Sequence, residues 1–166
     1  MVTFRTSAIA FLTAVFTCQT DATATPKLPV AYQAQPVQNC PPSPVSSQKQ
    51  AKIFQDFLQT FLIEGNITKT ATFLDVDYIQ HNPYVLSGRQ SFLDAFGSGG
   101  GGNSTFEIVH TALQNNIAWV HYKNIAPGSP LTAVVDVYRF NGSCIMEHWD
   151  VIQSLPADAI NPLALF

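Results

Sequence analysis

Hydrophobic residues recur at helical spacing in the first half of the chain. From Ser47 onward, apolar side chains return every three or four positions, which predicts an amphipathic helix packed on a core. The apolar stripe consists of Ile53, Phe54, Phe57, Leu58, Phe61 and Leu62. Ser47 and Gln50 fit a capping box at the start of this helix, and Gly65 can end it. Shorter helices are expected over residues 68–74 and 89–96.

The pattern changes to that of β-strands after residue 104. Four runs rich in β-branched and aromatic residues predict strands: 105–114, 117–124, 131–140 and 143–153. Asn115-Asn116 and Asn141-Gly142 separate the members of each pair and are typical of hairpin turns. Helices followed by two hairpins predict an α+β fold, in which a curved antiparallel sheet wraps around the N-terminal helices and encloses a pocket.

The first two dozen residues have the features of a secretory signal peptide. Arg5 precedes an apolar run over residues 8–16, which is shorter than the roughly 20 residues of a membrane span. Ala22-Thr23-Ala24 offers a cleavage site of small residues. We therefore expect a secreted protein without a membrane span in its mature form. The expected organisation is a signal peptide at 1–24, an extended Pro-rich arm at 25–46, one folded domain at 47–154 and a C-terminal tail at 155–166.

Two cysteines, Cys40 and Cys144, remain after removal of the signal peptide. An even pair in an oxidising compartment predicts one disulfide, and two buried thiols are the alternative. Three sequons, at Asn66, Asn103 and Asn141, would be glycosylation acceptors in a host that glycosylates exported proteins.

Charged residues make up 11% of the chain, and the formal net charge is -3. No basic patch with interleaved aromatic residues is present, which argues against nucleic acid as a partner. Because charges are scarce, two polar clusters stand out in apolar surroundings, at residues 78–83 and 147–150. In the second cluster, His148 and Asp150 are two positions apart on a predicted strand and therefore share one face.

The hairpin turn at Asn141-Gly142 decides which side chains join His148 and Asp150. A two-residue type I′ turn sets Asp136 opposite Glu147, so that Asp136 lies on the other face. A three-residue turn with a glycine bulge shifts the pairing by one and brings Asp136 to the face that carries His148 and Asp150. Both registers are compatible with the sequence.

His121 belongs to the neighbouring hairpin, and its alternation with Trp119 and Ile117 suggests an inward direction. If the sheet closes into a barrel, His121 and the turn that carries His81 would face the same cavity as Asp150. Imidazole and carboxylate groups gathered in an apolar cavity suit proton transfer.

A set of short motifs follows a fixed order along residues 47–153. The motifs are Tyr78-Ile79-Gln80-His81-Asn82-Pro83, Gly88, Phe92, Val120-His121, residues 136–142 and residues 147–151. In order and spacing they resemble the SnoaL-like polyketide cyclase family, which belongs to the nuclear transport factor 2-like superfamily. This resemblance implies a cone-shaped α+β barrel with a deep apolar pocket, homodimers, and neither a metal nor an organic cofactor.

The resemblance also implies roles for individual residues. Asp150 is the first candidate for acid/base catalysis, in line with the acidic residue that SnoaL-like cyclases use in aldol ring closure. Further catalytic candidates, which would orient that carboxylate, donate to an enolate oxygen or relay a proton, are His148, His121, His81 and Asp136. Candidate oxyanion donors that would bind the substrate are Tyr78 and Tyr138.

Structural alternatives exist for several of these residues. A histidine before Asn-Pro can tie its imidazole to the turn backbone, and this reading fits His81 as well as catalysis does. Glu147 and Arg139 fit a cross-strand ion pair on the solvent face. A metal site is not expected, because His-x-Asp spacing is common in strands and no HExxH or Cys-rich pattern is present.

Two functions are compatible with the sequence. The first is a secreted, cofactor-independent enzyme that carries out proton-transfer (enolate) chemistry, such as aldol cyclisation, isomerisation or dehydration, on a small apolar carbonyl compound. The second is a secreted protein that binds a small apolar molecule in the same pocket without turnover. Export argues against the first, since polyketide tailoring usually happens inside the cell. The cost of burying ionisable groups in a plain binding pocket argues against the second, and the enzyme is the preferred interpretation.

Overall fold

The structure, a computed structural model, describes residues 38–97 and 102–166. The expected signal peptide at 1–24 and the arm up to residue 37 lie outside these ranges. Within the described ranges, no helix combines the length and the apolar character needed to cross a membrane.

The helices precede most of the sheet in the chain. They are α1 (Ser47–Leu58) with a π-helical continuation (Gln59–Ile63), α2 (Ile67–Thr70) with a 3₁₀ turn (Ala71–Phe73), and α3 (Arg89–Phe96). Gly65 has a φ of 60° just after the π-helical turn, which confirms its expected role in ending the first helix.

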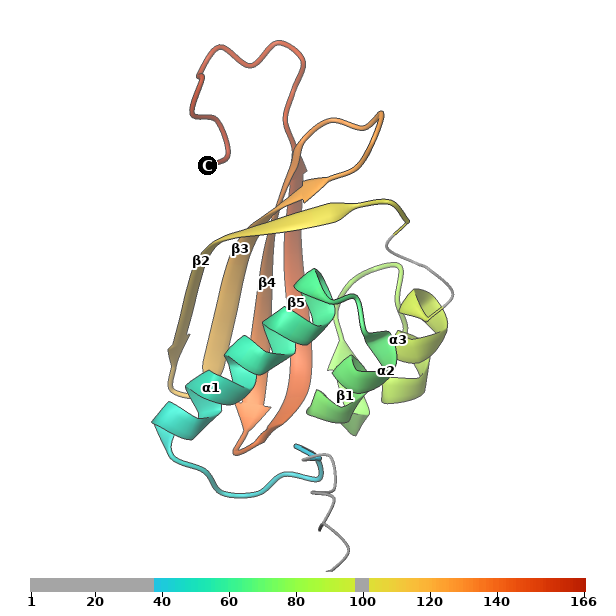
Figure 1. Cartoon of the computed structure of the whole chain (residues 1–166), viewed down its shortest axis with the longest axis vertical. Helices are drawn as coiled ribbons and strands as arrows, with labels where there is room; N and C mark the ends of the chain where they lie inside the picture. The colour runs from blue at the N-terminus through green and yellow to red at the C-terminus, as the bar shows by residue number, and fades with distance from the viewer. Residues whose placement is uncertain (1–37, 98–101) are drawn as a thin grey trace, which may run out of the picture. The chain divides into compact units, whose positions relative to one another are not determined.

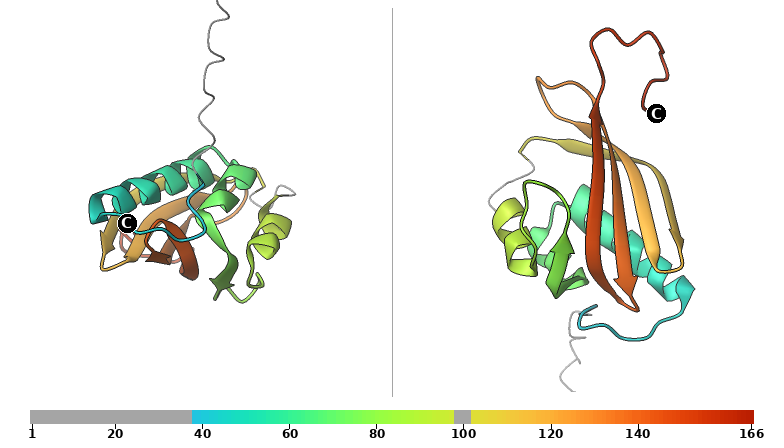
Figure 2. Two further views of the ribbon diagram at one scale, coloured as in Figure 1. Left: turned by 90° about the horizontal axis from the view of Figure 1, so that it is seen from below. Right: turned by 180° about the vertical axis from the view of Figure 1, so that it is seen from behind.

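Five strands form a single sheet in the order β1-β5-β4-β3-β2. They are β1 (Leu74–Gln80), β2 (Thr105–Gln114), β3 (Ile117–Ile125), β4 (Thr132–Asn141) and β5 (Cys144–Ser154). Neighbouring strands are antiparallel except β1, which pairs in parallel with β5. Helix α1 lies across one face of the sheet, which we call the inner face, and α2 and α3 lie close to β1 (Figure 1). The opposite, outer face carries none of the described helices (Figure 2).

The expected α+β fold, with helices on one face of a curved sheet, is confirmed. The four hairpin strands begin and end within one residue of their expected limits. Two features differ from expectation, because the sheet is mixed rather than antiparallel and stays open, with β1 and β2 as its edges. The alternation of apolar and polar residues does not predict β1. The register of β1 shifts between Leu74 and Ile79, and the side chains of Val76 and Ile79 are exposed.

Helix α1 is tied to the hairpin turns by a buried polar side chain. Its cap is Ser46, one residue earlier than expected, whose hydroxyl accepts the backbone N–H of Lys49 at 3.2 Å. Gln50 is therefore not part of a capping box. Its buried side-chain amide donates instead to Asn116 Oδ1 at 3.0 Å and to the Gly142 carbonyl at 2.8 Å. The first turn of the helix thus holds the tips of both hairpins.

Aromatic rings fill the space between α1 and the inner face. The Tyr138 ring lies 4.9 Å from the Phe57 ring and 6.0 Å from the Phe54 ring, centroid to centroid. On β3 the facing residues are small, and Ala118 and Val120 are completely buried. Large rings from the helix and small side chains from the strand therefore complement each other and fix the spacing of the two layers.

The outer face carries an apolar patch that is open to solvent. This outer-face patch consists of Ile79, Ile117, Trp119, Val137, Trp149 and Val151, which the strand register places on one side of the sheet. Val151 is 69% exposed and Trp119 is 38% exposed. Single exposed apolar side chains are common on protein surfaces, but a contiguous exposed apolar patch needs a physical explanation.

Glu147 forms the expected cross-strand ion pair on the outer face. Its Oε2 accepts from Arg139 Nε at 2.6 Å, and its Oε1 lies 2.8 Å from His81 Nε2. The His81 ring also stacks on Trp149, with 4.8 Å between centroids. The hydrogen bonds from His81 and from Arg139 lower the pKa of Glu147 below its ordinary value. His81 is therefore engaged on the outer face.

A disulfide between Cys40 and Cys144 joins the segment before α1 to the first residue of β5, as the sequence predicts. The same contact includes a backbone hydrogen bond of 2.9 Å from Ser143 to the Ser43 carbonyl. A Cβ atom at Gly142 would collide with that carbonyl oxygen, so the arm and the hairpin turn are in direct backbone contact.

Replacing Cys40 and Cys144 together by serine is expected to lower the free energy of unfolding. The bridge spans 104 residues, and loop entropy predicts a loss of about 5 kcal/mol for a loop of this order. Urea denaturation followed by circular dichroism measures the change, and alkylation with intact-mass analysis should find neither cysteine free in the native protein. Gly142→Ala, which leaves the bridge intact, separates the contribution of the backbone contact. An unchanged unfolding midpoint in the double serine variant would contradict the prediction.

Candidate active site

Asp136, His148 and Asp150 converge on the inner face because β5 contains one extra residue. The hairpin turn is Gly142-Ser143, and the register then shifts so that Met146 has no partner on β4. Asp136 consequently pairs with Asp150. The convergence considered from the sequence is therefore present, but neither of the two expected turns produces it. The cause is a bulge inside β5, several residues beyond the turn.

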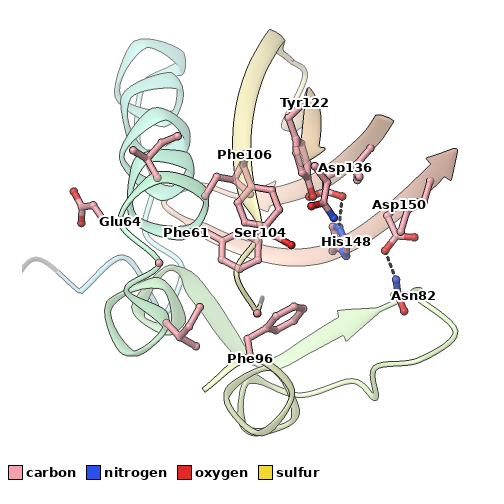
Figure 3. A pocket seen from close by; sticks show the side chains of 18 residues that line it. Phe61, Glu64, Asn82, Phe96, Ser104, Phe106, Tyr122, Asp136, His148 and Asp150 are labelled. Carbon is pink, nitrogen blue, oxygen red and sulfur yellow. Dashed lines mark hydrogen bonds and ion pairs between the residues drawn. The ribbon is translucent and has the colours of Figure 1, made fainter. Parts of the chain in front are cut away.

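A cavity of about 480 Å³ opens between the helices and the inner face. Its size falls within the range of small-molecule sites. Its polar end contains Asp136, His148, Asp150 and Asn82, while aromatic side chains form much of the remaining wall (Figure 3). The apolar lining includes Phe61, Phe96, Phe106, Val134 and Ile152.

The carboxylate of Asp136 is buried and held by two tyrosines. Tyr138 Oη donates to its Oδ2 at 3.0 Å, and Tyr122 Oη donates to the same atom at 3.2 Å. Burial, with the nearby Asp136 charge, raises the pKa of Tyr122 and of Tyr138 above the ordinary value of tyrosine. Both hydroxyls therefore keep their protons and act as donors. Asp136 Oδ1 is left to face His148.

His148 has one ring nitrogen that makes a hydrogen bond and one that makes none. Its Nδ1 lies 2.7 Å from Gln80 Oε1, which also accepts the backbone N–H of Asn82 at 3.0 Å. That backbone donor identifies the Gln80 atom as oxygen, so His148 Nδ1 must donate to it. Nε2 lies 3.3 Å from Asp136 Oδ1 and makes no hydrogen bond with any described residue. Nε2 is thus the ring nitrogen without a hydrogen bond, and it faces the Asp136 carboxylate.

Asp150 lines the cavity from the strand position next to Asp136. Its Oδ2 accepts from Asn82 Nδ2, the single hydrogen bond that the Asp150 side chain makes among the described residues. Asn82 is in turn oriented by the backbone N–H of Tyr84, which donates to Asn82 Oδ1 at 2.8 Å. One carboxylate oxygen is therefore held in place, and the other is left for a ligand.

The remaining predicted residues lie elsewhere. The expected inward direction of His121 is wrong, because Tyr122 takes the inner face of β3 and His121 stacks between His110 and Phe166 on the other side. His81 does not line the cavity either. Tyr78 and Tyr138 are buried behind the cavity and do not line it, and burial raises the pKa of Tyr78 as well.

Sequence reasoning assigned no role to three residues that shape the site. Gln80 orients His148, Asn82 orients Asp150, and Tyr122 binds Asp136. Gln80 and Asn82 belong to the polar cluster at residues 78–83. That cluster is the sequence feature that could have indicated their roles in the site. Their partners depend on the parallel pairing of β1 with β5, which sets Gln80 beside His148.

The same constellation has the composition of a metal site. Within the described ranges, Asp136, His148 and Asp150 form the single group of three ligand-type residues with mutually close donor atoms, within 4.8 Å of one another. One imidazole and two carboxylates suit a divalent cation such as Zn²⁺ or Mn²⁺. The tyrosine and asparagine contacts described above would orient such ligands equally well, so metal binding has to be tested alongside acid/base chemistry.

No family profile and no curated protein sequence matches the chain. Similarity is found among solved structures. An NTF2-like protein of unknown function from Mesorhizobium loti has a TM-score of 0.56 at 15% identity, over 68% of this chain and 98% of that chain. An NTF2-like protein of unknown function from Burkholderia xenovorans LB400 has a TM-score of 0.55 at 17% identity, over 68% and 88% of the two chains.

A further similar structure is the epoxide hydrolase/cyclase-like enzyme SalBIII, which has a role in pyran ring formation in the polyether salinomycin. Its TM-score is 0.53 at 17% identity, over 65% of this chain and 97% of that chain. At this level of identity the similarity concerns the fold. The chain therefore has the nuclear transport factor 2-like fold, the fold that its resemblance to the SnoaL-like polyketide cyclases implies.

Proposed function

We propose that the protein is a cofactor-independent enzyme that moves a proton next to the carbonyl group of a small apolar compound. The observation that carries this proposal is the convergence of Asp136, His148 and Asp150 at the polar end of an otherwise largely apolar cavity. Aldol cyclisation, isomerisation and dehydration all begin with such a proton transfer.

Asp150 is the proposed base, because it lines the cavity and is positioned through one oxygen by Asn82. Removal of a proton next to a carbonyl creates negative charge on the carbonyl oxygen, which needs a donor. His148 supplies that donor when Nε2 carries a proton, since Nδ1 is committed to Gln80. Asp136 is a positioning residue, whose Oδ1 lies 3.3 Å from Nε2 of His148.

Binding without turnover is the alternative, and the polar contacts argue against it. A pocket that only stores an apolar molecule gains nothing from two carboxylates and an imidazole, whose burial costs several kcal/mol unless they are paired. The similarity to SalBIII, a cyclase-like enzyme, gives independent support for catalysis on this fold.

We propose further that two copies of the chain associate through the outer-face patch. The patch is apolar and exposed in the isolated chain, and a two-fold arrangement would let the same strands cover each other. The cavity opens on the inner face, so this association would leave it accessible.

We also propose that the protein is exported and glycosylated. The disulfide is typical of oxidising compartments. Asn66, Asn103 and Asn141 are all exposed, as acceptor asparagines must be.

Asp150→Asn is expected to abolish proton transfer while preserving the fold. The amide keeps the size of the carboxylate but cannot act as a base, so the rate should fall by about 10² to 10⁴. The measurement is α-proton exchange of 4-phenylcyclohexanone in deuterated water, followed by NMR, together with ligand-induced shifts that report affinity. Asp158→Asn, an exposed change in the C-terminal tail, is the matched control. Equal loss of exchange and of thermal stability in Asp150→Asn would indicate a structural role instead, and loss of exchange after dialysis against EDTA would favour the metal site.

Val151→Arg is expected to convert the proposed dimer into a monomer, because a charge would be placed in the apolar contact. Light scattering coupled to size-exclusion chromatography measures the mass directly. Leu86→Arg is the control, since Leu86 is 80% exposed on the loop between β1 and α3. A wild-type protein that is monomeric at high micromolar concentration would rule out the proposed association.

The full chain, expressed in a eukaryotic secretory host, is expected to appear in the medium with Thr25 as its first residue. N-terminal sequencing identifies the cleavage point, and treatment with a peptide N-glycosidase should reduce the intact mass. Retention in the cell with an intact Met1 end would disprove export.

A further inference from the structure

The three sequons differ in the exposure of their third residue, which supplies the hydroxyl that a sequon requires. The acceptor asparagine is exposed in all three. Thr68 and Thr105, which complete the first two sequons, are exposed as well. Ser143, which completes the third, is buried, with 5% of its surface exposed. The sequon of Asn141 is therefore accessible at its first residue and covered at its last.

The cover is the arm that precedes α1, which the structure describes from residue 38 onward. Ser143 Oγ donates to the Asn39 carbonyl and accepts from the backbone N–H of Ser43 at 3.1 Å. Ser43 Oγ lies 2.9 Å away and acts as a second donor, because the single proton of Ser143 Oγ is already committed. One donor and two acceptor positions are the full capacity of a hydroxyl. Ser143 Oγ therefore has no position left for a modifying enzyme.

The backbone of this turn is covered by the same segment. The N–H of Ser143 donates to the Ser43 carbonyl at 2.9 Å. That carbonyl oxygen occupies the space that a side chain on the middle residue of the sequon would need. The disulfide lies next to these contacts, because Cys144 directly follows Ser143 in the chain. The bridge to Cys40 thus fastens the arm over the third sequon.

The third sequon and the second cysteine of the bridge become available together during synthesis. Cys144 is the third residue after Asn141, whereas Cys40 is made 104 residues before Cys144. Disulfide formation takes seconds to hours. Modification of Asn141 and docking of the arm therefore compete from the moment that this turn enters the oxidising compartment.

We infer that the disulfide controls modification of Asn141, which accepts a glycan only while the arm is undocked. The inference rests on the proposed export and glycosylation, and it adds to them an order of events and a difference among the three sites. Closure of the bridge blocks Asn141. It leaves Asn66 and Asn103 unaffected, because the hydroxyls of their sequons lie outside the contact with the arm.

Two covalent steps compete for this turn. In the first, the amide nitrogen of Asn141 bonds to the anomeric carbon of an oligosaccharide carried on a lipid diphosphate. The bond from that carbon to the phosphate oxygen breaks, and the nitrogen loses one proton. In the second, the thiols of Cys40 and Cys144 pass two electrons and two protons to the disulfide of a thiol–disulfide oxidoreductase, which becomes a dithiol.

Cys40→Ser tests the inference, because it removes the bridge at a position far from the sequon in the chain. Glycopeptide mass spectrometry of full-length protein from a eukaryotic secretory host, cells and medium combined, gives the occupied fraction of each site. We expect a glycan on Asn141 in a minority of wild-type molecules and in most molecules of the variant. Occupancy of Asn66 and Asn103 should be the same in both proteins. Since each site is compared with itself, differences in sequence between the sequons do not enter.

Phe92→Ala is the control variant. Phe92 is a buried core residue on α3, and its truncation destabilises the fold to a degree comparable with loss of the bridge. Because the arm and both cysteines are unchanged, Asn141 should keep its wild-type occupancy in this variant.

High occupancy of Asn141 in the wild-type protein, or low occupancy that persists in Cys40→Ser, would overturn the inference. So would an equal rise in Phe92→Ala, which would assign the effect to slow folding and not to the arm. Failure of the proposed export gives a different result, in which none of the three sequons carries a glycan. That result would remove the inference together with the proposal on which it rests.

Discussion

The buried carboxylate of Asp136 is the constraint on which the site depends. Asp136 is 4% exposed, and an unpaired charge at such a position would cost several kcal/mol. Two tyrosine hydroxyls and the imidazole of His148 offset that cost. Since these groups come from three adjacent strands, satisfying one charge also fixes the strand register and the orientation of the imidazole. Stability and chemistry therefore rest on the same contacts.

Much of the fold could be predicted from the sequence, because its main elements have strong local signals. The helical period of α1 reflects a helix with one buried face, and Asn115-Asn116 and Asn141-Gly142 lie at or next to the two hairpin turns. Strand β1 has no such signal. It is an edge strand with exposed apolar side chains, and it pairs with β5, a partner far away in the sequence. Its structure depends on a contact that no local pattern encodes.

The candidate site could be predicted in part. Side chains two positions apart on a strand point to the same face. The proximity of His148 and Asp150 therefore follows from the strand alone and does not depend on the rest of the fold. The bulge at Met146 that adds Asp136 is not visible in the sequence. His121 was misplaced because both faces of β3 carry apolar residues, and the inner face selects Ala118 and Val120, whose small size accommodates the rings of α1. The fit between the small side chains of β3 and the rings of α1 decides which face of β3 points inward. The hydropathy pattern alone does not contain this information.

The position of β5 in the sheet has a consequence for biosynthesis. β5 is the last strand to leave the ribosome, yet it lies between β1, the first strand made, and β4. Until it emerges, β1 has no strand to pair with, and Cys40 has no partner for its thiol. The sheet therefore cannot be completed until residues 144–154 have been synthesised.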